Sequence, residues 1–259
     1  MQESFPPTFD GLLQICARLR APGGCPWDRE QTRDSLKKQI LEETYELFEA
    51  IDENDAAKIV EEMGDVLLHM VFQVQIGVEE GSFTPDQVFA ANIDKLIRRH
   101  PHVFGDVRVS GSDEVLSRWQ EMKRKEKEAR GESLLDGVPK DLPALSYAQS
   151  IQERAARVGF DWDSIKGVLD KVREEIDELE AATTKEEREA EMGDVLFSLV
   201  NVSRWLKIDA EGTLRGTGAK FRRRFETMER LARERGLAFK ELSMDKKEAL
   251  WMEAKRTVG

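Results

Sequence analysis

Two pairs of acidic residues in the second half of the chain have the spacing of a metal site built on helices. Glu175 and Glu178 lie three positions apart, as do Glu191 and Asp194, and a short polar turn separates the pairs. Residues three apart share one face of a helix, so two antiparallel helices would direct all these carboxylates at one point. Carboxylates held together repel one another unless a cation lies between them. An oxygen-only ligand set suits Mg²⁺ or Mn²⁺ better than zinc, whereas a solvated acidic face is the alternative for this segment alone.

The same pattern occurs in the first half of the chain, which argues against a merely solvated face. Glu43 and Glu46 match the first pair, and Glu62 and Asp65 match the second. A repeat this long is a duplicated domain, because solenoid units repeat every ~20–50 residues. Basic and aromatic companions recur in the same order: Trp27-Asp28 with Trp162-Asp163, Lys95 and Arg99 with Lys220 and Arg224, and Trp119 and Lys123 with Trp251 and Lys255.

The composition indicates a folded chain that does not bind nucleic acid directly. The 259 residues suffice for two domains, and 40% of them are hydrophobic. A formal net charge of −11 disfavours nucleic-acid binding. Two cysteines, Cys16 and Cys25, are too few for a disulfide framework, and we expect a reducing, cytoplasmic location. The segment MQESFPPTFDG is unlike a signal peptide, and no run approaches the ~20 apolar residues of a membrane span.

Helical periodicity predicts an all-α fold of two tandem helical bundles. Val107 and Val109 offer at most a short extended piece. Glycines and prolines between 131 and 143 mark a linker between a first domain, 1–130, and a second, 144–259, and no proline follows Pro143. The expected helices are 9–20, 35–54, 56–80, 85–100, 113–130, 144–158, 164–182, 185–207, 210–235 and 245–257, with a loop at 104–112.

Three details of the acidic segments predict how their helices pack. Gly64, and its counterpart Gly193, cost about 1 kcal/mol inside a helix, so we expect close packing at that turn. Val66 to Val74 is apolar nearly all round, which is typical of a buried central helix. His69 follows Asp65 by one turn, and we interpret it as a buried histidine whose hydrogen bonds are satisfied.

Cations follow the carboxylates in both halves. Lys220 and Arg224 share one face of a helix, as do Trp251 and Lys255. Carboxylates that hold Mg²⁺ beside cations that hold phosphate oxygens describe a site for a metal-chelated polyphosphate. A tryptophan there could form an apolar wall or stack on a base. Plain core packing of the tryptophans and a solvated face for the cations are the alternatives.

This ordered set resembles the MazG family of nucleoside triphosphate pyrophosphohydrolases, of the all-α NTP pyrophosphatase superfamily. The resemblance covers nearly the whole chain. It implies a helical domain that dimerises and a Mg²⁺-dependent conversion of an NTP and water to an NMP and pyrophosphate, with breadth across bases and a role in nucleotide-pool housekeeping. The motifs are CPWDREQT at 25–32, LEETYE at 41–46, EEMGDVL at 61–67, RRHPHVFGDV at 98–107, GVPKDLPAL at 137–145, GFDW at 159–162, EMGDVLF at 191–197 and KFRRRF at 220–225.

Motif matching also assigns roles to residues. No Ser–His–Asp or Cys–His arrangement is evident, so water activated by Mg²⁺ and a glutamate would attack the α-phosphorus. The catalytic candidates are Glu174, which would orient the water, and Glu175. The metal ligands would be Glu175, Glu178, Glu191 and Asp194, and in the first domain Glu43, Glu46, Glu62 and Asp65. The substrate-binding candidates are Lys171, Glu187, Lys220, Arg224, Trp251 and Lys255, and in the first domain Lys95, Arg99, Trp119 and Lys123.

Some of these assignments have alternatives. Lys171, one turn before Glu175, could be a phosphate contact or a helix salt bridge worth ~0.3–0.5 kcal/mol. Its first-domain counterpart is the uncharged Gln39, and the second domain has three successive arginines, Arg222 to Arg224, where the first has Ile97, Arg98 and Arg99. The second domain is therefore the expected site of turnover.

Three other classes of function stay open for the whole protein. The first is another enzyme of the same superfamily, either specific for one base or a house-cleaning dNTP hydrolase. The second is a di-iron carboxylate bundle, and the third is a non-catalytic nucleotide-binding or interaction module. The di-iron class needs a Glu-x-x-His on each of two helices, which His69, His100 and His102 do not supply.

Overall fold

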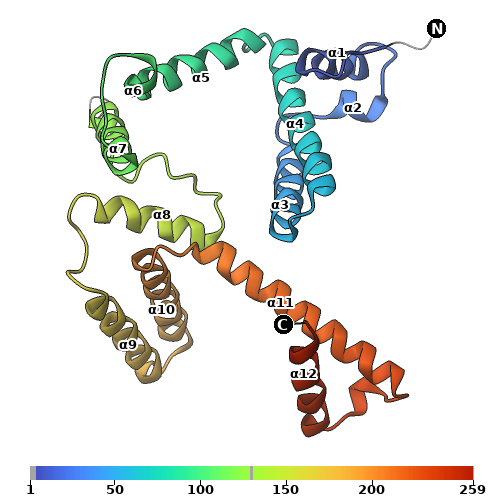
Figure 1. Ribbon diagram of the computed structural model, residues 1–259, viewed down its shortest axis with the longest axis vertical. Helices are drawn as coiled ribbons and strands as arrows, with labels where there is room; N and C mark the ends of the chain where they lie inside the picture. Colours follow the sequence, from blue (N-terminus) through green and yellow to red (C-terminus); the bar gives the residue numbers. More distant parts are fainter. Residues whose placement is uncertain (1–3, 129–130, 259) are drawn as a thin grey trace. The chain divides into compact units, whose positions relative to one another are not determined.

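The protein is helical throughout the part that the computed structural model describes, residues 4–128 and 131–258 (Figure 1). Side chains are described in those ranges except at Asp113, Leu116, Gln120, Lys123 and 125–128. Among these residues the regular elements are twelve α-helices and one short 3-10 helix, which confirms the all-α prediction. Val107 and Val109 lie in a loop. No helix of the described part is long and apolar enough to cross a membrane. The chain forms two compact units, 1–122 and 123–259, which divide within α7, before the expected linker at 131–143.

The first unit is organised around an antiparallel pair of helices, α3 and α4. Asn54 adopts a left-handed conformation (φ 55°) between them, and the Asp55 carboxylate caps α4. Helix α1 packs on α4 over a core that includes Cys16, Leu36 and Phe72. The bounds are α1 (Phe9–Arg20), α2 (Pro26–Glu30), α3 (Lys37–Glu53), α4 (Ala56–Glu79), α5 (Pro85–Arg99), α6 (Pro101–Phe104) and α7 (Ser112–Glu128). The short helices α2 and α6 were not expected, and each begins with a proline, whose fixed φ suits a first helical position.

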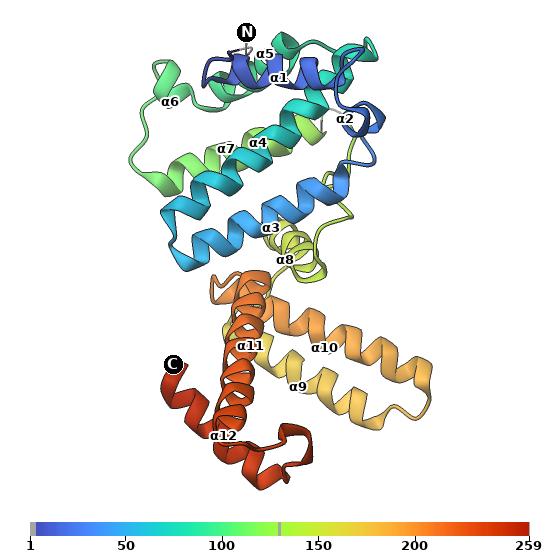
Figure 2. The same ribbon diagram turned by 90° about the vertical axis from the view of Figure 1, so that its right-hand side faces the viewer.

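The second unit repeats the antiparallel pair as α9 and α10, with α8 packed against α10 (Figure 2). A capping box of Thr184 and Glu187 begins α10, in the Thr-x-x-Glu pattern that is typical of helix starts. A second pair, α11 and α12, encloses its own core, which contains Met228, Leu231 and Leu250. The bounds are α8 (Ala144–Ala156), α9 (Ile165–Ala181), α10 (Lys185–Trp205), α11 (Ala210–Glu234), the 3-10 helix η1 (Phe239–Glu241) and α12 (Met244–Val258).

The middle of α4 is buried on one side only, so the expectation of a fully buried central helix is wrong. Val71 is completely buried, whereas Leu67 is 45% exposed and Met70 is 39% exposed. A Cβ added at Gly64 or at Gly193 would meet no atom within 4 Å, so the close packing expected at these glycines is absent from the described part of the chain. Each long helical pair thus keeps an apolar face that nothing in its own unit covers.

Candidate functional site

The second unit brings three of its four predicted metal ligands together. Glu175 and Glu178 on α9 and Glu191 on α10 each direct a carboxylate oxygen into one cluster, with the three oxygens within 4.8 Å of one another. Asp194 lies one turn further along α10. Partial burial, followed by the charges of Glu178, Asp194 and Glu175, raises the pKa of Glu191. These four residues are called the second cluster below.

The first unit builds the same arrangement on α3 and α4. Oxygens of Glu43, Glu46 and Glu62 also lie within 4.8 Å of one another. Partial burial raises the pKa of Glu62, and the charges of Glu46, Glu61, Asp65 and Glu43 raise it further. Glu43, Glu46, Glu62 and Asp65 are called the first cluster. Burial accounts for the largest part of both raised pKa values, and repulsion between like charges, which a divalent cation relieves, adds to it. Both oxygen donor sets therefore fit Mg²⁺ or Mn²⁺.

Lys171 forms ion pairs with two glutamates on its own helix, α9, at the edge of the second cluster. Its ammonium donates to Glu174 Oε1 and to Glu175 Oε1, both at 2.7 Å, and these two bonds raise the pKa of Lys171. Glu175 is only 5% exposed, whereas Glu174 lies at the surface. A buried carboxylate is stable when a cation compensates its charge. Lys171 therefore serves as the counter-ion of Glu175.

The first cluster has a different neighbour. His69 Nε2 lies 3.7 Å from Glu43 Oε1, which is too long for a hydrogen bond. Within the described residues, buried His69 Nδ1 and Gln39 Oε1 have no hydrogen-bond partner. The expectation that His69 is a satisfied core histidine is therefore wrong. The sequence showed that a lysine was missing at position 39, but it did not show that α4 presents an imidazole to Glu43.

The predicted basic and aromatic residues meet one another on a separate pair of helices. The Arg224 guanidinium on α11 lies 5.8 Å from the ring centre of Trp251 on α12, and Phe221 lies 5.4 Å from the same ring. In the first unit the Arg99 guanidinium lies 6.0 Å from the ring of Trp119. Both repeats therefore keep an arginine–tryptophan contact. Exposed Lys95, Lys220 and Lys255 lie on the same helices as these residues, and the side chain of Lys123 lies outside the described part.

The α11–α12 pair does not carry its cations to the second cluster within one chain. Both views show α12 beside α11 and apart from α9 and α10 (Figures 1 and 2). Helix α11 is joined to α8 near its start, where the Ala210 amide donates to Gln149 Oε1 at 3.0 Å. No cation contributes to the pKa shift of Glu191. The structure thus assembles the carboxylates and the Arg224–Trp251 contact as two separate groups.

Glu187 requires a correction. Its Oε2 accepts hydrogen bonds from the Thr183 and Thr184 amides, at 2.8 and 3.1 Å, and from Thr183 Oγ1 at 3.0 Å. These bonds lower the pKa of Glu187 and hold the first turn of α10. The carboxylate serves the helix start rather than a substrate.

A cavity of about 370 Å³ opens beside the second cluster. Phe160, Trp162 and Phe197 form aromatic walls, and Lys171, Glu175 and Asp194 lie at the same cavity. Two buried amides, Gln152 and Asn201, also line it. Sequence reasoning missed Gln152, Phe160 and Asn201. The available signal was Asn201 itself, because its counterpart by the EMGDVL repeat is Phe72, a residue of the first unit's core.

Arg204 fixes the loop that carries two of these aromatic residues. Its Nη1 donates to Asp161 Oδ2 at 2.9 Å, its Nε donates to Asn201 Oδ1 at 2.7 Å, and Trp205 Nε1 donates to Asp161 Oδ1 at 2.9 Å. The Arg204 bonds lower the pKa of Asp161. The α8–α9 loop, with Phe160 and Trp162, is thereby held to the end of α10.

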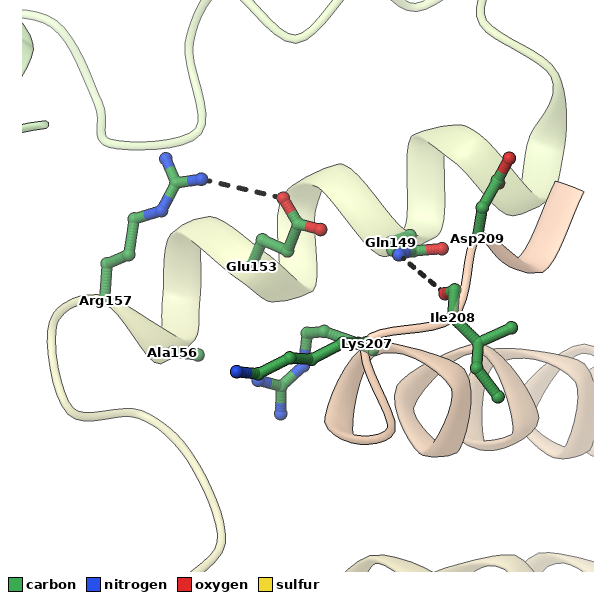
Figure 3. Close-up of a pocket in the computed structure, with 8 residues that line it drawn as sticks. Gln149, Glu153, Ala156, Arg157, Lys207, Ile208 and Asp209 are labelled. Carbon is green, nitrogen blue, oxygen red and sulfur yellow. Dashed lines mark hydrogen bonds and ion pairs between the residues drawn. The ribbon is translucent and has the colours of Figure 1, made fainter. Parts of the chain in front are cut away.

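A larger cavity, about 550 Å³, lies between α8 and the α10–α11 turn (Figure 3). In it Glu153 faces Arg157 at 3.6 Å, and Gln149 Nε2 donates to the Ile208 carbonyl at 3.1 Å. Its walls carry both signs of charge and none of the cluster carboxylates. This larger cavity lies at a junction between helices, whereas the smaller cavity lies beside the second cluster.

Comparisons with known proteins show which proteins this chain resembles over most of its length. A family model described as the MazG nucleotide pyrophosphohydrolase domain matches residues 31–104. The chain is 46% identical over 247 residues to the Thermotoga maritima nucleoside triphosphate pyrophosphohydrolase/pyrophosphatase MazG, covering 95% of each chain. It is 45% identical over 255 residues to the Escherichia coli nucleoside triphosphate pyrophosphohydrolase, covering 96% of this chain and 97% of that one. It is also 47% identical to the uncharacterized protein YabN of Bacillus subtilis, covering 96% of this chain and 52% of that protein.

Proposed function

The chain belongs to the MazG family, and from that premise we propose that it hydrolyses nucleoside triphosphates to the monophosphate and pyrophosphate in its second unit. The observation that carries the proposal is the second cluster with a cavity lined by aromatic residues at its side. The carboxylates fit the metal that a triphosphate requires, and the cavity fits the flat, apolar part of a nucleoside.

The residues would divide the reaction among them. Mg²⁺ or Mn²⁺, held by Glu175, Glu178, Glu191 and Asp194, would polarise phosphate oxygens and lower the pKa of a water. Lys171 orients Glu175 through their ion pair. Glu174 is the proposed acceptor of the water's proton. The water oxygen forms a bond to the α-phosphorus while the bond from that phosphorus to the bridging oxygen breaks, and pyrophosphate leaves.

The second unit is the better candidate because of what surrounds its cluster. In the second unit the cation Lys171 lies beside Glu175. The first unit has Phe72 at the position that matches Asn201, and this ring is 4% exposed and packed in the core. An apolar ring in that core leaves less room for a nucleoside beside the first cluster. We propose that the first unit binds metal and supports assembly.

We also propose a homodimer that completes the site. Large side chains on the α9–α10 pair, among them Ile176, Met192 and Leu196, are 41–49% exposed. Burying such a face against a second copy removes apolar surface from water, and the open space at Gly193 would admit close approach of another helix. The Lys220 and Arg224 side chains would then meet the polyphosphate across the dimer.

Phosphorus NMR of the products in ¹⁸O-labelled water tests the proposed reaction. We expect a monophosphate that carries the label and an unlabelled pyrophosphate from triphosphates of several bases, loss of activity with EDTA, and recovery with Mg²⁺ or Mn²⁺. A diphosphate and orthophosphate would place the cleavage at another phosphorus and overturn the mechanism.

A further inference from the structure

One residue that lines the cavity beside the second cluster has a buried hydrogen-bond acceptor with no partner within the described residues. Gln152, on α8, is 8% exposed, and its Nε2 donates to the Phe197 carbonyl at 2.8 Å. Its Oε1 is shielded from solvent and accepts no hydrogen bond from any described residue. Because a backbone carbonyl can only accept, the amide must direct its NH₂ group to Phe197, which leaves the oxygen as the free end.

Such an oxygen requires an explanation, because most buried polar atoms in proteins are hydrogen-bonded. The neighbouring amide, Asn201, has a partner, since its Oδ1 accepts from Arg204 Nε at 2.7 Å. Gln152 is therefore the exception among the two amides that line the cavity. An acceptor left unpaired beside a ligand cavity can be paired by a donor on the ligand.

The surroundings of Gln152 indicate what kind of donor that is. Phe160, Trp162 and Phe197 present aromatic surface to the same cavity, and Glu175 and Asp194 stand at it. Aromatic walls stack on flat rings of any base, whereas the carboxylates hold metal and polyphosphate. A flat ring with an N–H on its edge, joined to a metal-bound polyphosphate, satisfies both parts of the site.

We propose that Gln152 is a specificity-determining residue whose Oε1 accepts a hydrogen bond from an N–H on the edge of the nucleobase. The inference rests on the proposed pyrophosphohydrolase function. Adenine and cytosine carry an exocyclic amino group, guanine carries one as well, and uracil and thymine carry a ring N–H. A single acceptor therefore admits every common base and rejects a ring whose edge has no donor.

Oε1 is shielded from solvent in the free protein, so a bound base reaches it only if a neighbouring side chain shifts. Phe160, which lines the same cavity, is 79% exposed on the α8–α9 loop, so its ring has room to turn. Because Oε1 is already removed from water in the free protein, a bound N–H gains a hydrogen bond without a further cost of dehydrating this oxygen. The bond therefore adds to selectivity between ligands that differ in one N–H.

The test compares ATP with purine riboside triphosphate, which lacks the exocyclic amino group. We expect the wild-type protein to favour ATP by about 10- to 100-fold in kcat/KM, and the nearly isosteric Gln152→Met to reduce that ratio to within about threefold. Gln149→Met is the matched control, because Gln149 lies on the same helix and its amide is bonded to Ile208 and Ala210 instead. It should keep the wild-type ratio.

The ratio is taken within each protein preparation, so it does not depend on the fraction that folds. A wild-type ratio near one, or an unchanged ratio in Gln152→Met, overturns the assignment of Gln152. If both triphosphates still give monophosphate and pyrophosphate, the proposed function survives that result. If neither is cleaved in this way, the proposed function itself has failed.

Discussion

In the first unit the carboxylate Glu43 faces a histidine from the opposite helix, whereas in the second unit the matching Glu175 is bonded to Lys171 from its own helix. The acidic ligands are otherwise alike, with three oxygens within 4.8 Å in each cluster. A duplicated domain can therefore keep its carboxylate clusters while the residues beside them diverge. The charge beside the cluster separates the two sites, and the number of carboxylates does not.

The space beside the cluster also differs between the two units. Phe72 is buried in the core of the first unit, and the matching Asn201 lines a cavity in the second. An aromatic ring packed among apolar side chains stabilises a fold, whereas a polar side chain at a cavity wall can face a ligand. This difference supports the proposal that the second unit carries the reaction and the first acts as a scaffold.

Substitutions of the basic residues in each unit give the first test of the difference between the two units. Lys220→Ala and Arg224→Ala should each lower kcat/KM for triphosphates by about 10- to 100-fold, because each removes a charge-assisted bond worth about 1.5–3 kcal/mol. Lys95→Ala and Arg99→Ala are the matched controls in the first unit and should change kcat/KM by less than about twofold. Steady-state kinetics on proteins with wild-type circular dichroism provide the values. Wild-type kcat/KM in both second-unit variants would make these residues surface charge.

The lysine that distinguishes the two clusters has a smaller expected effect. Lys171→Met leaves Glu175 buried without its cation, and because about a third of the Lys171 side chain is exposed, solvent screening limits the loss to about 1–2 kcal/mol. Gln39→Met should cost less than about 0.5 kcal/mol, since the Gln39 oxygen has no partner to lose.

Urea unfolding with and without Mg²⁺ measures the effect of Lys171→Met. Metal bound to the native cluster should offset part of the loss, because it binds the folded state and neutralises the same carboxylate. Equal losses from Lys171→Met and Gln39→Met would mean that Lys171 is an ordinary surface salt bridge.

Much of the fold follows from local patterns that the sequence displays. The capping boxes that begin at Thr84 and Thr184 are present, and the chain after Pro143 forms long helices without interruption. The three-residue spacing of the acids predicted their convergence, because helix periodicity alone puts them on one face.

Other features depend on contacts between elements that are distant in sequence, and no pattern shows these. The orphaned Nδ1 of His69 and the unpaired oxygen of Gln152 arise from packing between helices. Glu187 was assigned to substrate binding, whereas its Oε2 caps the start of α10. The separation of Arg224 from the second cluster likewise reflects how the α11–α12 pair leaves α8, which residue spacing does not encode.

The most direct test of the account compares the two clusters by removing one charge at a time. Glu175→Gln and Asp194→Asn change the second cluster with little change in shape, and Glu43→Gln and Asp65→Asn do the same in the first. We expect kcat/KM to fall by about 100-fold or more in the second-cluster variants and by less than about threefold in the first-cluster variants. Equal losses in the two sets, in variants with wild-type circular dichroism, would contradict the assignment of turnover to the second unit.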